Sequence, residues 1–295
     1  MIDALEFGAL PLARALSAFF TNPLVLICLL VDALVILRLA QYGLNGGRLV
    51  ARMRSRPWPL REAARLVLAL TAAVLAVRLS VSFLFHLETG GTARREALWV
   101  IGQTLFLHAC VVMLIAGRLR PRRLTWREAF GLERRRAWPD ARRGAVGYLA
   151  AVPAVGALAL TWSLFLVRVG LPPEPQLVVR MLMEPQPAGV RFGMIAIAVV
   201  TAPVAEELLF RGVGLPLFIR RFGVLPGITL LSLLFAAVHF HLFSWVPLFA
   251  MAWAFSLAYL YSGSIVAPIV MHALFNGVSL AILFAVHAPG AGAAL

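Results

Sequence analysis

The sequence predicts an all-α, polytopic membrane protein of about eight transmembrane helices, with a candidate active site in its C-terminal four-helix half. Of its 295 residues, 61% are hydrophobic and 14% are charged, and the mean hydropathy is +0.89. Soluble domains are about 45–50% apolar and about 25% charged. A helix that crosses about 30 Å of hydrocarbon needs roughly 20 apolar residues. Eight stretches meet this need, near residues 23–43, 64–87, 97–117, 144–169, 190–211, 224–241, 243–262 and 264–287.

The basic residues are all arginine, and they lie mainly between the apolar stretches. Two connections are especially rich in them, the one near residues 44–63 and the one near 118–143. Under the positive-inside rule these loops face the cytoplasm, which predicts a multi-pass protein of a plasma or inner membrane. The same distribution explains the net charge of +14 without nucleic acid, so we expect no nucleic-acid partner.

The other connections suggest how the spans are joined. Residues 124–136 mix apolar and basic side chains and predict either an interfacial helix or a solvated basic loop. Residues 171–186 are rich in proline and predict an extended loop on the opposite side. Very short turns join the last four spans, which predicts a compact antiparallel bundle. We therefore expect one membrane domain, with an N-terminal half at 1–189 and the polar motifs at 190–295.

The segment TAPVAEELLFRG, residues 201–212, places three ionisable side chains in apolar surroundings. Such a side chain at bilayer depth costs from about 2.5 to over 10 kcal/mol, so it usually has a partner or a function. Glu207 and Arg211 stand four residues apart in the favourable order, which predicts an ion pair with a structural role. Glu206 points about 100° away on a helix and has no local partner. This pattern suits a general base or acid.

Two further polar segments follow in apolar surroundings. His239 lies four residues after Phe235, so the two share a helix face, and His272 and Asn276 share a face in the same way. A histidine and a carboxamide on one face are able to donate hydrogen bonds to a developing oxyanion, whereas histidines with a glutamate are able to bind zinc. The remaining histidines are interpreted as interfacial residues: His86, His108, His241 and His287.

Helix geometry predicts that these segments meet at one depth. If the fifth helix continues to Arg221, Glu206 lies about 22 Å above that end, and His239 rises about 20 Å in the next helix. His272 rises about 12 Å in the last helix and reaches the same layer if that helix tilts. Pro216 offers an alternative, because a proline inside the extension could end the fifth helix early and separate these depths.

The three segments together resemble the motifs of the CPBP intramembrane protease family, which includes type II CAAX prenyl endopeptidases and bacteriocin-processing and immunity proteins. The resemblance covers about the last 90 residues. Its motifs are E-E-x-x-x-R at Glu206, Glu207 and Arg211, F-x-x-x-H at Phe235 and His239, and H-x-x-x-N at His272 and Asn276.

The resemblance implies hydrolysis of a peptide bond within the membrane, near the C-terminal end of a membrane-embedded or lipid-anchored protein or peptide. It implies that Glu206 activates water with help from His239, and that His272 and Asn276 stabilise the oxyanion. Glu207 and Arg211 would brace the helix, with Phe235 in support. It indicates no oligomeric state.

The sequence is compatible with a reaction that uses zinc and with one that uses no metal. Glu206, His239 and His272 are the ligands that a catalytic zinc ion would use. The sequence contains no H-E-x-x-H pair, and an asparagine near His272 suits an oxyanion better, so a reaction without a cofactor is favoured. Two other classes stay open, a catalytically inactive membrane scaffold or immunity partner and a transporter. The unpaired Glu206 argues against the scaffold, and the lack of paired broken helices argues against the transporter.

Overall fold

The computed structural model describes residues 46–86, 93–171 and 174–287, and every regular element in these ranges is a helix. The expected first span, near 23–43, lies outside them. The first part holds α3 (Gly46–Arg54), α4 (Leu60–His86), α5 (Ala93–Leu119), η1 (Arg120–Arg122), α6 (Trp126–Phe130), η2 (Arg134–Arg136) and α7 (Ala137–Arg168). The second part holds α8 (Leu177–Met183), α9 (Ala188–Ala196), η3 (Ile197–Thr201), α10 (Ala202–Glu207), η4 (Leu208–Gly214), α11 (Leu215–Phe222), α12 (Val224–Ala237), α13 (Leu242–Ser262) and α14 (Val266–Val286).

Within the described ranges, six helical stretches are long and apolar enough to cross a membrane. They are Leu60–Ser80, Arg94–Arg122, Arg134–Arg168, Ala188–Phe222, Leu242–Ser262 and Val266–Val286. The sixth expected span, near 224–241, is α12, whose 14 residues reach only about 21 Å. The all-α polytopic fold is therefore confirmed, with α12 too short to cross the hydrocarbon alone.

The helix that carries the paired glutamates runs without a break from Ala188 to Phe222. It contains two π segments, η3 and η4, and each is followed by a proline in the first turn of the next α segment, Pro203 and Pro216. A proline lacks the N–H and crowds the carbonyl of the preceding turn, and a wider turn relieves both conflicts. Pro216 thus does not end the helix, and the extension that the depth argument required is present. Gly223, with φ of 86°, then turns the chain into α12.

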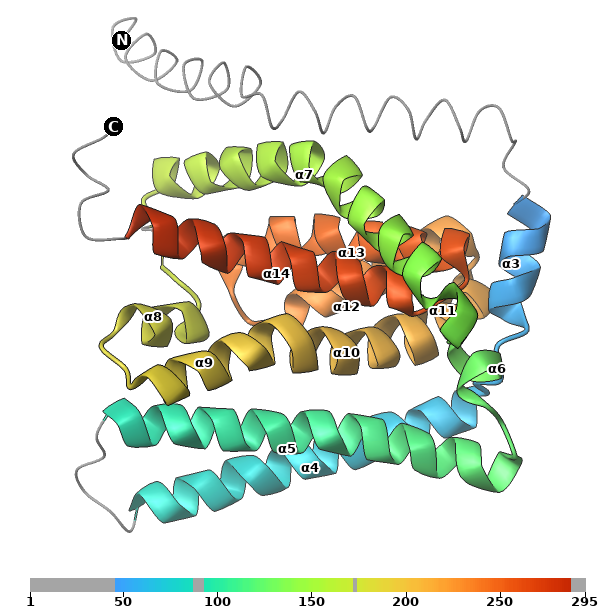
Figure 1. The fold of residues 1–295 in the computed structure, drawn as a ribbon, viewed down its shortest axis with the longest axis horizontal. Helices are drawn as coiled ribbons and strands as arrows, with labels where there is room; N and C mark the ends of the chain where they lie inside the picture. The colour runs from blue at the N-terminus through green and yellow to red at the C-terminus, as the bar shows by residue number, and fades with distance from the viewer. Residues whose placement is uncertain (1–45, 87–92, 172–173, 288–295) are drawn as a thin grey trace, which may run out of the picture.

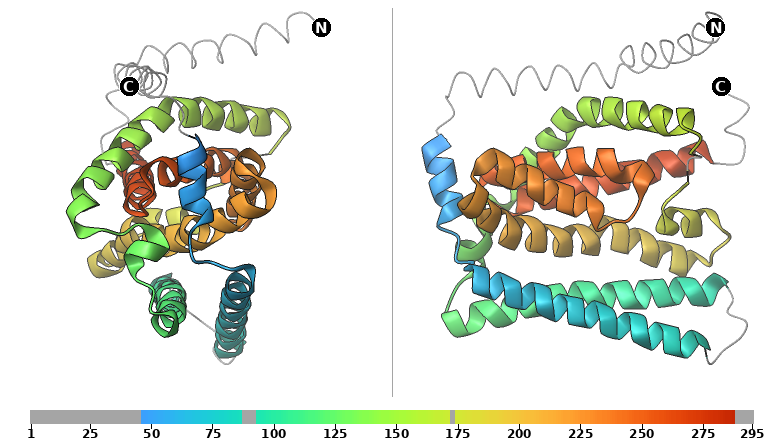
Figure 2. Two further views of the ribbon diagram at one scale, coloured as in Figure 1. Left: turned by 90° about the vertical axis from the view of Figure 1, so that its right-hand side faces the viewer. Right: turned by 180° about the vertical axis from the view of Figure 1, so that it is seen from behind.

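The helices lie in layers (Figure 1). The pair α4 and α5 forms the lowest layer of that view, and the continuous helix α9–α11 lies on it through α5. Next come α12, α13 and α14, and α7 packs across α13 and α14 on the far side. The two further views show the pair α4 and α5 at one side of the molecule, with α5 in contact with α9 and α10 (Figure 2). The C-terminal half, from α9 to α14, therefore forms the closely packed bundle that the short turns predicted.

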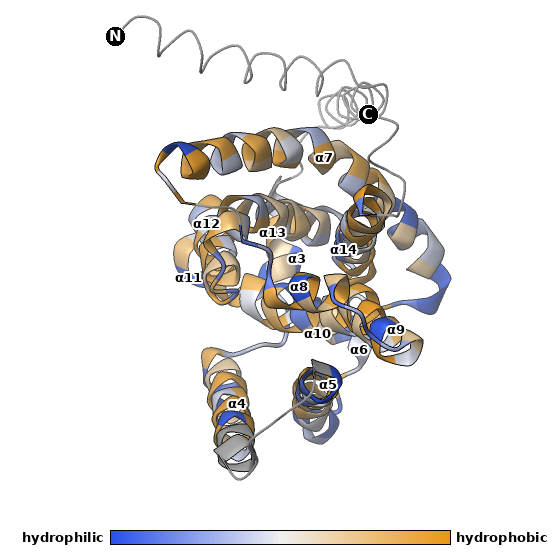
Figure 3. Cartoon of the chain, turned by 90° about the vertical axis from the view of Figure 1, so that its left-hand side faces the viewer, coloured by the Kyte–Doolittle hydropathy of each residue, from blue (hydrophilic) through white to orange (hydrophobic). Residues whose placement is uncertain are grey.

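Hydrophobic residues make up most of the length of the long helices (Figure 3). On α4, large side chains point outward with most of their area exposed, among them Leu60 (74%), Leu68 (72%) and Leu79 (70%). A soluble protein rarely exposes continuous apolar surface of this extent, whereas lipid covers it at no cost. Together with the six long apolar helices, this surface identifies an integral membrane protein.

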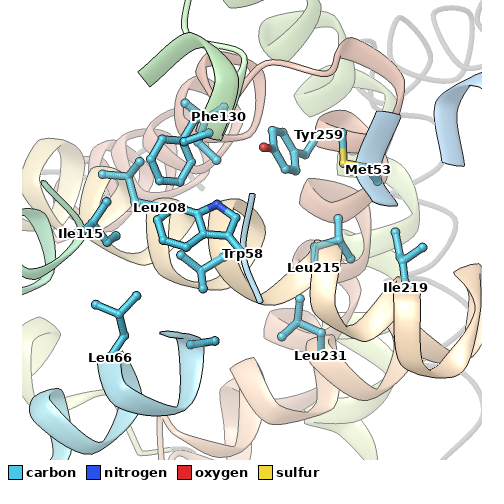
Figure 4. Packing of buried hydrophobic residues seen from close by; sticks show 14 of the residues in the cluster. Met53, Trp58, Leu66, Ile115, Phe130, Leu208, Leu215, Ile219, Leu231 and Tyr259 are labelled. Atoms are coloured by element: carbon cyan, nitrogen blue, oxygen red, sulfur yellow. The ribbon is translucent and has the colours of Figure 1, made fainter. Parts of the chain in front are cut away.

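The arginine-rich end is the end at which α3, α6 and the end of α11 gather (Figure 1). The largest apolar cluster lies beside it and surrounds Trp58 and Phe130, whose side chains have no exposed area (Figure 4). The ring of Phe130 lies 5.4 Å from that of Trp58 and 5.3 Å from that of Trp126. Both expectations for residues 124–136 are therefore wrong in part, because this segment is neither a surface helix nor a free loop. Its α6 helix inserts Phe130 into the core.

The opposite end also differs from its prediction. The connection at 171–186 contains the helix α8, so it is not a continuous extended loop. Side-chain bonds attach it to the start of α13: Gln176 Nε2 donates to Ser244 Oγ at 2.8 Å, and His241 Nε2 donates to the carbonyl oxygen of Glu174 at 2.9 Å. His241 thus stays near a helix end, as expected. The division of the chain at residues 189 and 190 stays a prediction.

Candidate active site

The Glu206 carboxylate lies between two imidazole rings that come from two other helices. Its Oε2 is 3.9 Å from His239 Nε2, after α12, and 3.9 Å from His272 Nε2, on α14. The side chains of Glu206 and His239 are each 26% exposed, and that of His272 is 6% exposed. A separation of 3.9 Å is too long for a direct hydrogen bond and suits one bridging water molecule. The structure thus brings these three predicted residues to one point.

The hydrogen bond of His239 sets the state of its second ring nitrogen. Its Nδ1 lies 2.7 Å from the carbonyl oxygen of Phe235, one helical turn earlier. A carbonyl only accepts, so Nδ1 carries the hydrogen and donates it. In the neutral ring, Nε2 is then an acceptor that faces Glu206. The four-residue spacing of Phe235 and His239 therefore fixes the ring as well as placing it.

Glu207 is fully buried, and its Oε1 has two partners. Arg211 Nη1 donates to it at 2.9 Å, which is the predicted ion pair, and His272 Nδ1 also donates to it at 2.9 Å. The interpretation of Glu207 as a brace for its own helix is therefore incomplete. Because Glu207 fixes the Nδ1 hydrogen of His272, it also directs the Nε2 of that ring toward Glu206.

Aromatic rings hold these charged groups in place. The guanidinium carbon of Arg211 lies 4.6 Å from the ring centre of Phe235 and 5.1 Å from that of Phe255. Phe255 stacks on the ring of His272 at 4.8 Å, and the ring of Phe235 lies 4.7 Å from that of His239. Cations and aromatic faces attract one another by up to about 2 kcal/mol when water is excluded. Phe235 therefore touches both the cation and a histidine, which agrees with a supporting position.

Asn276 has a partner that the sequence did not suggest. Its Nδ2 donates to the carbonyl oxygen of Ala198, in η3, at 2.8 Å. An amide nitrogen carries two hydrogens, so Asn276 keeps one further donor. Asn276 shares a helix face with His272, and its recorded hydrogen bond joins α14 to the helix of Glu206.

His108 was missed as a neighbour of the site. It lies in the middle of the α5 span, and its Nδ1 is 3.0 Å from Thr201 Oγ1 in η3. It is also close enough to Glu206 for their charges to interact. The interfacial interpretation of His108 is therefore wrong. Its depth within the span was the signal that could have found it, because a histidine at mid-membrane usually has a polar partner.

The arrangement does not fit a tetrahedral zinc site. Zinc ligands lie about 2.0–2.2 Å from the metal, which separates them from one another by about 3.4 Å. The two separations from Glu206 Oε2 are 3.9 Å, and His272 Nδ1 is bound by Glu207. Within 46–86, 93–171 and 174–287, no group of three or more His, Cys, Asp or Glu residues has metal-binding geometry. We therefore derive no step through a metal.

Comparison with known families gives a match to this part of the chain. The family model described as Type II CAAX prenyl endopeptidase Rce1-like matches residues 188–278. Residues 188–278, called the Rce1-like segment below, are thus similar to that family. The Rce1-like segment begins at the first residue of α9, ends within α14 and contains all three motifs. The resemblance seen in the motifs is thereby confirmed. Comparison with curated proteins and with solved structures found no match.

The Rce1-like segment does not include every group around the site. α4, α5 and α7 lie outside it, yet α5 brings His108 against Thr201. α7 covers α13 and α14, the helices that hold Phe255 and His272. The helices before residue 188 therefore complete the surroundings of a site whose three motifs lie after it.

Proposed function

We propose that the protein is an intramembrane endopeptidase that hydrolyses a peptide bond near the C-terminus of a membrane-embedded or lipid-anchored protein or peptide. The observation that carries the proposal is the position of Glu206, 3.9 Å from the Nε2 atoms of both His239 and His272. The match of residues 188–278 to Type II CAAX prenyl endopeptidase Rce1-like proteins supports CAAX-type processing.

In the proposed reaction, Glu206 accepts a proton from a water molecule as the water oxygen attacks the scissile carbonyl carbon. His239 orients that water through its Nε2 lone pair. The carbonyl oxygen becomes an oxyanion, and the intermediate collapses when the C–N bond breaks. Glu206 returns its proton to the departing amine nitrogen. No atom other than those of water and the peptide is consumed.

His272 stabilises the oxyanion in this scheme only as an imidazolium. Its Nδ1 hydrogen is bound by Glu207, so its Nε2 must also carry a hydrogen in order to donate. With His272 protonated, the buried group holds two positive charges, His272 and Arg211, and two negative ones, Glu206 and Glu207. This balance avoids an uncompensated charge in a medium of low dielectric constant. The second amide hydrogen of Asn276 is the other proposed donor.

Substitution of Glu206 by glutamine tests the proposal. The probe is a prenylated peptide with a CAAX-type C-terminus, carrying a fluorophore and a quencher, in liposomes with the purified protein. Glu206→Gln removes the base, so we expect cleavage to fall by at least about 10²–10⁴-fold. Because Glu206 Oε2 has no hydrogen-bond partner and the side chain is 26% exposed, the variant should still fold. Glu174→Gln, at an exposed glutamate outside the site, is the matched control and should cleave like the parent.

Retained cleavage by Glu206→Gln, or its failure to fold, would overturn the assigned role. An unprenylated peptide of the same sequence tests the substrate class. Equal cleavage of both peptides would refute recognition of the lipid anchor and leave the hydrolytic role intact.

We propose that the reaction needs no metal, and the separations around Glu206 support this. Exhaustive dialysis against a strong chelator, followed by metal analysis of the protein, should leave the rate of peptide cleavage unchanged. Loss of cleavage that added zinc restores would contradict the metal-free scheme.

We also place the arginine-rich end on the cytoplasmic side of a plasma or inner membrane, from the positive-inside rule.

A further inference from the structure

A cavity of about 400 Å³ opens at the arginine-rich end, where α4 begins and α5 and α11 end. Its walls include Arg56, Trp58, Arg122, Leu124 and Arg220. The volume falls within the range of small-molecule sites, about 300–1,000 Å³. None of the residues that line it is an aspartate or a glutamate. It is therefore a cavity with cationic and apolar walls, and none of the candidate active-site residues lines it.

Two of its arginines are held by neutral partners. Arg56 is 8% exposed and donates to the carbonyl oxygens of Glu128 at 2.8 Å and Gly263 at 2.6 Å. Arg220 donates to the carbonyl oxygens of Arg56, at 3.0 Å, and Trp58. Carbonyl oxygens accept hydrogen bonds but carry no formal charge. In the part of the chain that the structure describes, no carboxylate forms an ion pair with either guanidinium group.

Two buried donors of residues that line this cavity also lack a partner, Arg56 Nε and Trp58 Nε1. Arg56 Nε is fully buried and has no hydrogen bond. Buried charges in proteins are normally paired, and an unpaired buried donor costs about 1–3 kcal/mol. The Arg56 side chain, in the wall of the cavity, therefore combines an unbalanced charge with an unused buried donor.

The acidic group that interacts with Arg122 does not balance this charge. Glu62, in the first turn of α4, interacts electrostatically with Arg122. Its two carboxylate oxygens are already taken, because Arg65 Nη1 and Arg118 Nη1 each donate to one of them at 2.9 Å. The exposed guanidinium group of Arg122 thus remains available at the rim of the cavity.

Crowding of positive charge extends to the neighbouring helix α3. Burial, together with the positive charges of Arg56 and Arg136, lowers the pKa of the Arg52 guanidinium from its ordinary value. A protonated arginine in such surroundings gains from any nearby anion. The whole arginine-rich end of the molecule therefore carries an excess of positive charge, and the cavity is a concave region of this end.

The location of the cavity selects a lipid over a soluble anion. Three apolar spans end beside it, which places it at the depth of the lipid headgroups. From its Pro59 wall the chain enters α4, whose outward side chains Leu60 and Leu68 are 74% and 72% exposed. An acyl chain that lies on this face would continue directly into the hydrocarbon.

We propose that this cavity binds the phosphate of an anionic phospholipid headgroup, with Arg56, Arg122 and Arg220 around the phosphate and the acyl chains along α4. Basic pockets at the ends of transmembrane helices are suited to such headgroups. Trp58 and Leu124 form the apolar part of the wall, and Trp58 is in turn fixed by the core around Phe130 (Figure 4).

Binding to the intact protein in detergent micelles tests this site. Phosphatidylglycerol, phosphatidylcholine and inorganic phosphate are titrated separately, and bound lipid is counted by native mass spectrometry. We expect saturable binding of phosphatidylglycerol and weaker binding of phosphatidylcholine, whose choline group meets three guanidinium groups. Arg122→Gln should weaken phosphatidylglycerol binding about five-fold, the factor expected for loss of one basic residue at an anionic membrane surface. Arg120→Gln, an equal charge change on the same short helix but outside the cavity, should change it less than two-fold.

Equal weakening by Arg122→Gln and Arg120→Gln would overturn the proposal, because it would show a general surface charge effect. Equal binding of both lipids would overturn it as well. In a third outcome, inorganic phosphate binds as tightly as phosphatidylglycerol, and its binding is weakened by Arg122→Gln but not by Arg120→Gln. That result would refute the lipid as the ligand in favour of free phosphate. Arg122 is exposed, so both variants should unfold at the parent temperature in the absence of lipid.

Discussion

Asn276 offers a test of how the π segment before Glu206 is maintained. In η3, the N–H of Ala202 bonds the carbonyl oxygen of Ile197, five residues earlier. The next donor in this pattern would be residue 203, which is a proline and has no N–H. The carbonyl oxygen of Ala198 therefore loses its helical partner, and Asn276 Nδ2 replaces it at 2.8 Å.

Asn276→Ala should leave that carbonyl group without a donor. An unsatisfied group of this kind costs about 1–3 kcal/mol when buried. In a Pro203→Ala background, residue 203 has an N–H, so the helix is able to supply a donor to Ala198 whether it keeps the π turn or relaxes to an α turn. We therefore expect Asn276→Ala to cost much less in that background, with a coupling free energy of about 1–2 kcal/mol.

The assay is reversible unfolding in mixed micelles, followed by tryptophan fluorescence, for both single variants and the double variant. Pro216→Ala is the matched control, since Pro216 follows η4 as Pro203 follows η3. Asn276→Ala should cost the same in the Pro216→Ala background as in the parent. An equal cost in the Pro203→Ala background would refute the reasoning. Peptide cleavage tests the other proposed role of Asn276, as an oxyanion donor. If the Pro203→Ala background restores cleavage to Asn276→Ala as well as stability, Asn276 is not an oxyanion donor.

Two further predictions concern stability. Glu207→Gln should cost about 3–5 kcal/mol in the same unfolding assay, because it leaves the buried Arg211 charge without its hydrogen-bonded carboxylate; a loss under 1 kcal/mol would contradict that dependence. Gly144→Ala should cost about 1–3 kcal/mol, since its Cβ would lie 2.3 Å from the Ala267 carbonyl oxygen. Gly102→Ala, with no atom within 4 Å of its Cβ, should instead stabilise the protein by about 0.5–1 kcal/mol. Equal effects of Gly144→Ala and Gly102→Ala on stability would contradict the close packing of α7 and α14.

The parts of the fold that the sequence predicted depend on distance along one helix. The meeting of Glu206 with His239 was expected from the constant helical rise on the two sides of Gly223, and the structure has both residues at one level. The ion pair of Glu207 and Arg211 was expected from four-residue spacing, for the same reason. In such cases the spacing in the sequence determines where the residues lie relative to one another, because they share a helix or adjoining helices.

The parts that were missed depend on contacts between helices that are distant in sequence. Phe130 looked like part of a charged surface segment, but it packs on Trp58, 72 residues earlier, and lies where a Cβ on Gly212 would clash with it. His108 lies in the front half, where no motif drew attention to it, and its partner Thr201 is 93 residues later. The spacing of residues within one helix does not indicate which side chains of a distant helix will contact them.

The two glutamates of the motif act as a linked pair, although helical geometry points them in different directions. Glu207 is buried and Glu206 is partly exposed, as expected for adjacent residues about 100° apart. His272 joins them, because its Nδ1 donates to Glu207 while its Nε2 faces Glu206. His272 thus links the buried Glu207 to Glu206, the carboxylate that is proposed to activate water. A carboxylate at 207 one methylene shorter would lie about 1.5 Å further from both Arg211 and His272, so the length of this side chain, as well as its charge, is needed to aim His272 at Glu206.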